Sequence, residues 1–116
     1  MGASTFYNIA IGRYNTPNEA FLERIDRARY EYGHGGYTGT IAEKDSFRLV
    51  PVAKRIDPFK LVEEYINDES GFWADKWGPA ACVEIQNTYL QKLKERRGYK
   101  GKKGIKAYIF FGWASD

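Results

Sequence analysis

Tyr-Glu-Tyr-Gly-His-Gly-Gly-Tyr-Thr-Gly-Thr, residues 30–40, decides how the chain is divided, because a helix must end there and a strand must begin. The stretch holds four glycines and the only histidine of the protein. Glycine adopts backbone conformations that other residues avoid, so such a junction either turns the chain tightly or directs backbone N–H groups toward a ligand. The sequence leaves both interpretations open.

The residues before this junction predict a helix. Thr16 is a suitable N-cap, Pro17 suits the first helical position, and Glu19 completes a capping box. Apolar residues then recur at 21, 25, 28 and 32, which is helical spacing. Gly33 is a natural left-handed C-cap. We therefore expect a helix over residues 17–32.

The rest of the chain predicts a single α+β domain over residues 1–116. Strands are expected at 4–11, 38–44, 47–52, 81–85 and 105–113, and further helices at 57–67 and 87–97. The strands at 38–44 and 47–52 are expected to form a hairpin, with Pro51 at a sheet edge. This order predicts a two-layer, ferredoxin-like sandwich, β-α-β-β-α-β plus an extra C-terminal strand, with two main helices on one face of a largely antiparallel sheet.

The charge of the chain is unevenly distributed. The net charge is +3, but residues 92–106 hold eight cations and one acid, so the rest of the chain is acidic. We interpret residues 87–104 as a basic inserted segment. Such a segment indicates either a localised anionic partner or a mobile loop kept soluble by lysines. No apolar run approaches the roughly 20 residues needed to cross a bilayer, so we expect a cytoplasmic protein without a membrane partner.

The leading hypothesis is a non-enzymatic protein that binds a phosphate-bearing ligand, such as a nucleotide or a cyclic-nucleotide signal. We call the stretch near residues 35–38 the glycine turn. Its backbone donors would cradle the phosphate, the basic segment would neutralise it, and an aromatic ring would stack on the base. The candidate ligand-binding residues are His34, Gly35, Gly36, Tyr37, Thr38, Thr40, Arg96, Arg97, Lys102 and Lys103, and the candidate stacking or interface residues are Trp73, Trp77 and Tyr99. The alternatives are a helix cap and turn for the glycines, a capping role for His34, and a plug at the open end of the sandwich for the two tryptophans.

Other kinds of site have weaker support in the sequence. The glycines match neither the P-loop nor the Rossmann pattern. One cysteine and one histidine do not supply a zinc site, so no metal or cofactor is expected. Cys82 lies in an apolar run and is expected to be a buried structural thiol. An enzyme that uses His34 as a general base is the weakest class, because no recognisable motif pairs His34 with a nucleophile.

Two stretches resemble known proteins. Residues 28–44 (ARYEYGHGGYTGTIAEK) and 76–80 (KWGPA) are similar to small, largely uncharacterised proteins of bacteriophages and prophages. The resemblance implies a viral accessory protein that acts in a bacterial cytoplasm and counteracts host defence. Such a protein would work by binding, and we expect a homo-oligomer because the chain offers candidate edge strands. The alternatives are an inhibitor that docks on a host protein, and an RNA- or DNA-binding protein.

Overall fold

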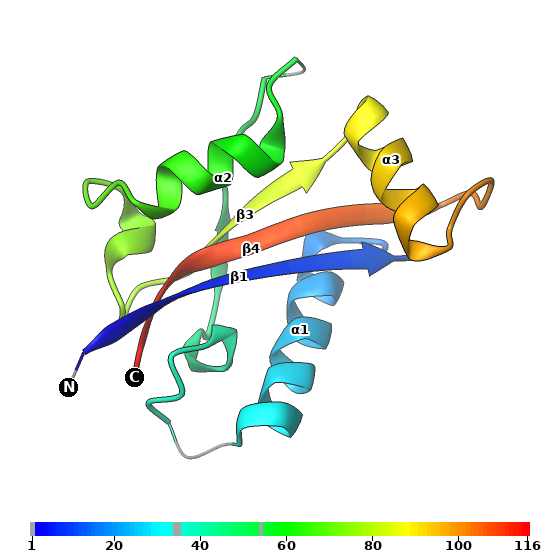
Figure 1. The fold of residues 1–116 in the computed structure, drawn as a ribbon. Helices are drawn as coiled ribbons and strands as arrows, with labels where there is room; N and C mark the ends of the chain where they lie inside the picture. Colours follow the sequence, from blue (N-terminus) through cyan, green and yellow to red (C-terminus); the bar gives the residue numbers. More distant parts are fainter. Residues whose placement is uncertain (1, 34–35, 54) are drawn as a thin grey trace.

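The computed structural model describes residues 2–33, 36–53 and 55–116, and it has the predicted α+β class (Figure 1). Strands and helices alternate along the described chain, with short 3-10 helices at Ile41–Glu43 and Phe72–Ala74. None of the helices in these ranges is long and apolar enough to cross a membrane. The elements are β1 (Ala3–Gly12), α1 (Pro17–Tyr32), β2 (Phe47–Leu49), α2 (Pro58–Ile66), β3 (Ala80–Ile85), α3 (Asn87–Arg97) and β4 (Lys106–Ser115).

The strands form one mixed sheet with the order β1-β4-β3-β2. β4 pairs antiparallel with both β1 and β3, whereas β2 pairs parallel with β3. The sheet is therefore largely antiparallel, as predicted. The last strand is also central, and its residues from Ala107 to Gly112 are all buried. Its near-continuous apolar sequence indicated this place, because a strand covered on both sides needs no polar face.

The helices cover both faces of the sheet, so the prediction of two main helices on one face was wrong (Figure 1). Phe21 and Ile25 of α1 pack in the same cluster as Phe110 of β4. Val62 of α2 and Leu93 of α3 belong to the cluster on the opposite face. β3 and β4 carry apolar side chains at successive positions, and successive side chains point to opposite faces. Both faces of the sheet must therefore be buried by helices. The arrangement has three layers instead of two, with α1 on one side of the sheet and α2 and α3 on the other.

The expected hairpin of residues 38–44 and 47–52 does not form. Thr40 accepts a hydrogen bond from the amide of Ala42 and caps the 3-10 helix at Ile41–Glu43, where a strand was predicted. The amide of Gly39 donates instead to the carbonyl of Ser115 in the last strand. In the second half, Phe47–Leu49 pairs with β3 and the chain leaves the sheet soon afterwards. Side-chain capping and a long-range bond thus outweigh the extended propensity of this stretch.

The predicted helix ends are confirmed at three places. The hydroxyl of Thr16 accepts the amide of Glu19 at the start of α1. The carboxylate of Asp57 accepts the amide of Phe59 at 2.9 Å and starts α2. Gly98 adopts the left-handed conformation, with φ +82°, and ends α3. The supposed inserted segment is therefore α3 followed by a short loop that leads into β4.

Candidate anion-binding groove

The glycine turn holds a carboxylate of its own chain. Glu43 accepts hydrogen bonds from the amides of Tyr37 and Thr38, at 3.1 and 3.2 Å, and from the Thr38 hydroxyl at 2.7 Å. The hydroxyls of Thr38 and Thr40 lie 2.8 Å apart. These donors were predicted to cradle a phosphate, and in the structure they are used by Glu43. Gly36 is exposed nearby, and His34 and Gly35 lie outside the described residues.

The glycine turn and the basic segment lie at opposite ends of β4 (Figure 1). Gly39 is hydrogen-bonded to Ser115, at the last residue of the strand, whereas the basic segment leads into the first residue, Lys106. A strand of ten residues is about 30 Å long, from a rise of about 3.3 Å per residue. One small nucleotide therefore cannot contact both segments within a single subunit.

The two tryptophans have different environments. Trp73 is buried, its ring stacks on Tyr65 at a centroid distance of 4.9 Å, and its Nε1 donates to the carbonyl of Asp68. It is a core residue, and no face of its ring is left for a ligand base. Trp77 is 69% exposed and meets the ring of Tyr37 edge-on at 6.3 Å. Of the two predicted stacking tryptophans, the accessible one is thus on the glycine-turn side.

The cations of the basic segment do not form one patch. Arg96 and Arg97 are neighbours on α3, but each lines a different hollow of the surface. Lys102 lies over the ring of Tyr99, with its Nζ 5.6 Å from the ring centre. Its backbone carbonyl accepts a 2.7 Å hydrogen bond from Nζ of Lys94, which ties the loop to α3. Lys103 is exposed.

Arg97 belongs to a polar groove of about 580 Å³ that includes three further arginines. We call it the arginine groove. Arg24 and Arg27 come from α1, and Arg13 follows the end of β1. A groove of this volume is large enough for a nucleotide-sized ligand. The remaining lining residues are Ile9, Ile11, Gly12, Tyr14, Glu19, Glu23 and Tyr99.

The two glutamates of the arginine groove are hydrogen-bonded to groups other than its arginines. Glu23 accepts a 2.7 Å hydrogen bond from the hydroxyl of Tyr14, and Glu19 accepts the amide of Asn15. Burial, followed by this bond to Glu23, raises the pKa of Tyr14, so the hydroxyl keeps its proton. Nε of Arg24 is buried and has no hydrogen-bond partner among the described residues. A buried donor without a partner is uncommon and calls for an acceptor.

Sequence reasoning identified only part of this groove. It singled out Arg97 and Tyr99, but it did not include Arg24 and Arg27 among the candidate residues. A signal was present, because positions three apart on a helix share a face. What the sequence did not provide was the position of α3, whose end brings Arg97 to that face.

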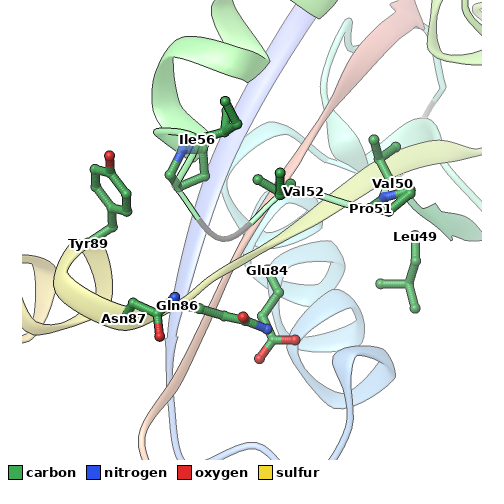
Figure 2. A pocket seen from close by; sticks show the side chains of 11 residues that line it. Leu49, Val50, Pro51, Val52, Ile56, Glu84, Gln86, Asn87 and Tyr89 are labelled. Carbon is green, nitrogen blue, oxygen red and sulfur yellow. The ribbon is translucent and has the colours of Figure 1, made fainter.

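A second hollow lies at the other edge of the sheet (Figure 2). It measures about 370 Å³, and its wall is largely apolar. Leu49 and Ile56 are 61% and 46% exposed there, and Figure 2 places the side chains of Glu84 and Gln86 on the side opposite to that of Ile56. Asn87 has a positive φ of 59° where β3 passes into α3. Sequence reasoning did not identify this hollow.

Comparisons of the chain with protein-family models, with curated proteins and with solved structures found no match.

Proposed function

We propose that this protein is a non-enzymatic binding protein that captures a phosphate-bearing ligand, such as a nucleotide or a cyclic nucleotide, in the arginine groove. The observation that carries the proposal is the convergence of four arginines from three separate parts of the chain. Arginine matches phosphate oxygens with a planar fork of donors. Its guanidinium has donors and no acceptor, so it suits the holding of an anion and not the transfer of protons.

The aromatic part of the proposed site is Tyr99. It is half-buried at the groove, and the ammonium of Lys102 lies over its ring. A ring in this position can stack on a base, while Lys102 adds a mobile charge for a phosphate. The glycine turn has no part in this site, because Glu43 takes its donors. The phage origin and the cytoplasmic location remain predictions from the resemblance and the composition.

The adjacent pair Arg96 and Arg97 provides a matched test. Binding of inorganic pyrophosphate, ATP, a cyclic dinucleotide and a short oligonucleotide is measured by thermal shift and calorimetry. Arg97→Ala is expected to weaken binding of the best ligand about 10- to 100-fold, since a hydrogen bond to a charged group contributes about 1.5–3 kcal/mol. Arg96→Ala removes the same charge outside the groove and is expected to leave the affinity within about 3-fold.

Two outcomes would contradict the proposal: no ligand of the panel shifts the melting temperature, or both variants weaken binding equally. Salt separates the ligand classes. Oligonucleotide binding would fall steeply with salt, because each neutralised phosphate releases counterions. A mononucleotide with fewer phosphate contacts would show a shallower slope.

A second candidate function is docking on a host protein, and the exposed aromatic pair favours it. Trp77 is 69% and Tyr37 52% exposed, and tryptophan and tyrosine often dominate binding energies at interfaces. A partner that binds here would be lost with Trp77→Ala and kept with Arg97→Ala. The opposite pattern would exclude docking through this pair.

A further inference from the structure

β1 is a long strand with one unpaired edge. The sheet order places it at the end of the sheet, with β4 as its neighbour. Edge strands are usually protected by a charge, a proline or short length. The other edge strand, β2, is three residues long, contains Arg48 and is followed closely by Pro51. β1 has ten residues and includes neither a charged residue nor a proline.

The register identifies which backbone groups lie on this free edge. The amide of Asp116 donates to the carbonyl of Gly2, so the backbone groups of Gly2 point toward the last strand. In a strand these groups alternate between the two sides. A second hydrogen bond gives an independent check. The amide of Val50 donates to the carbonyl of Cys82, so the backbone groups of Cys82 point toward β2. Following the alternation from Cys82 across β3 and β4 identifies the same residues on the free edge of β1. The residues whose N–H and C=O groups point away from β4 are therefore Ala3, Thr5, Tyr7, Ile9 and Ile11.

These five residues are symmetric about Tyr7. We propose that β1 pairs antiparallel with β1 of a second copy of this chain, about a two-fold axis at Tyr7, so that the two sheets become continuous. In this register Thr5 lies opposite the partner's Ile9. A two-fold interface requires one patch that is complementary to itself, and a centred antiparallel strand meets this requirement. Thr5 and Tyr7 are exposed and belong to the residue types that favour strands.

The charges beside β1 differ along its length. The hollow at Thr5 to Asn8 of β1 is lined by Glu31 and Arg24, whereas the arginine groove, which reaches β1 from Ile9 onward, has four arginines against two glutamates. A two-fold axis at Tyr7 places the first half of one strand beside the second half of the other. Glu31 of one copy then lies toward the arginine-rich end of the other, whereas a parallel arrangement would bring the two arginine-rich ends together.

This pairing is made by backbone groups of β1, so it forms without the proposed ligand. The paired strands end at Ile11, opposite the partner's Ala3; Ile9 and Ile11 of the arginine groove lie in the interface, whereas Arg13 and Arg97 lie beyond its paired residues. Dimerisation is therefore measured without any ligand. A failure of ligand binding leaves this inference standing, and a monomeric protein leaves the proposed function standing.

Analytical ultracentrifugation tests the oligomeric state. The wild-type protein is expected to sediment with twice the chain mass of 13.3 kDa at micromolar concentration. Tyr7→Lys places like charges opposite each other at the axis and is expected to give a monomer. The control is Tyr30→Lys, the same change on the outer surface of α1, where the side chain is 91% exposed, and it is expected to remain a dimer.

A wild-type monomer at 100 µM, or a Tyr7→Lys dimer as tight as the wild type, would overturn the proposal. Circular dichroism shows whether Tyr7→Lys is folded. If it is not folded, the sedimentation of Thr5→Pro is measured instead. Proline lacks the backbone N–H that Thr5 directs away from β4. The pairing of β1 with β4 therefore remains intact, and only the dimer is expected to be lost.

Disulfide trapping tests the register. Opposed residues of a hydrogen-bonded antiparallel pair have Cα atoms about 5.5 Å apart, which a disulfide spans. Thr5→Cys mixed with Ile9→Cys is expected to form a cross-linked heterodimer under mild oxidation, while Thr5→Cys alone is not. Self-linking of Thr5→Cys, or no link in the mixture, would contradict this register. The native Cys82 is fully buried and does not compete.

Discussion

Lys44 donates a 2.9 Å hydrogen bond from its Nζ to the backbone carbonyl of Gly78, although the Lys44 side chain is only 2% exposed. The same ammonium donates to the carbonyls of Asp75 and Lys76, and it lies 5.8 Å from the ring centre of Phe6. One buried charge thus closes the loop before β3 and attaches it to the 3-10 helix at Ile41–Glu43.

Replacing this lysine should destabilise the fold. Lys44→Met keeps the aliphatic stem but leaves three carbonyls without their donor. The expected loss is about 3 kcal/mol of the free energy of unfolding, since an acceptor left without its partner costs about 1–3 kcal/mol. Urea denaturation measures the loss. Lys60→Met, an exposed change on α2, is the control and is expected to stay within about 0.5 kcal/mol of the wild type.

Lys44 also makes the free energy of unfolding depend on pH, in a direction that its pKa shift determines. Burial lowers the pKa of Lys44, and the nearby Asp75 partly opposes this. In the window between the folded pKa and the unfolded value of about 10.4, the unfolded chain binds this proton more tightly. The contribution of Lys44 to stability therefore rises with pH through that window. The difference in free energy of unfolding between the wild type and Lys44→Met is expected to increase toward pH 10.5; a constant or falling difference would contradict this.

Gly71 is expected to be intolerant of any side chain. A Cβ atom there would lie 2.2 Å from the ring of Trp73, which is held by Tyr65 and by its bond to Asp68. Gly71→Ala should therefore cost more than about 2 kcal/mol through overpacking. Gly98→Ala is the comparison, since its Cβ meets no atom within 4 Å and only the positive φ of 82° opposes it, at about 1 kcal/mol. Equal melting temperatures for the two variants would refute the steric argument.

Cys82 should be inert in the folded protein. Burial, followed by the charge of Glu84, raises the pKa of Cys82 to about 12. The thiolate is the reactive form, so labelling by a thiol reagent at pH 8 is expected to be negligible until urea unfolds the chain. Tyr30→Cys adds an exposed thiol and is expected to react at once. Rapid labelling of the wild type would show that β3 opens locally.

Glu43 should order the turn after α1. Its carboxylate receives the amides of Tyr37 and Thr38, and Tyr37 has a strained positive φ of 58°. Glu43→Gln weakens these charge-assisted bonds. Hydrogen exchange at the two amides, followed by NMR, is expected to accelerate at least 10-fold, while exchange in β4 stays unchanged. Equal acceleration in both regions would indicate global destabilisation instead.

The helices and the central strand were predictable from local patterns. Thr16 with Pro17, and Asp57 with Pro58, are start signals that act within one turn of helix, so their outcome does not depend on distant residues. The hairpin prediction was wrong because distant residues determine the structure of that stretch. Gly39 is hydrogen-bonded to Ser115 and Lys44 to Gly78, and the sequence near Gly39 and Lys44 does not indicate either pairing.

The candidate site was predictable only in part, for the same physical reason. The cations of α3 were visible as a cluster, but the fold separates Arg96 from Arg97 and joins the latter to Arg24. The glycine turn was recognisable as a nest of donors, yet the residue that occupies it, Glu43, belongs to the same chain. Composition reports which groups are present, and only packing decides which of them meet.

The pairing of β1 with β4 also has a kinetic consequence. The first strand of the sheet finds its neighbour at the far end of the chain, with Ala3 opposite Ser115. Contacts so distant in sequence carry a large loop-closure cost and slow the folding of a domain. During synthesis, β1 and α1 leave the ribosome long before β4 exists. Until β4 has been synthesised, both edges of β1 are unpaired. During this interval the chain is most accessible to chaperones and most prone to aggregation.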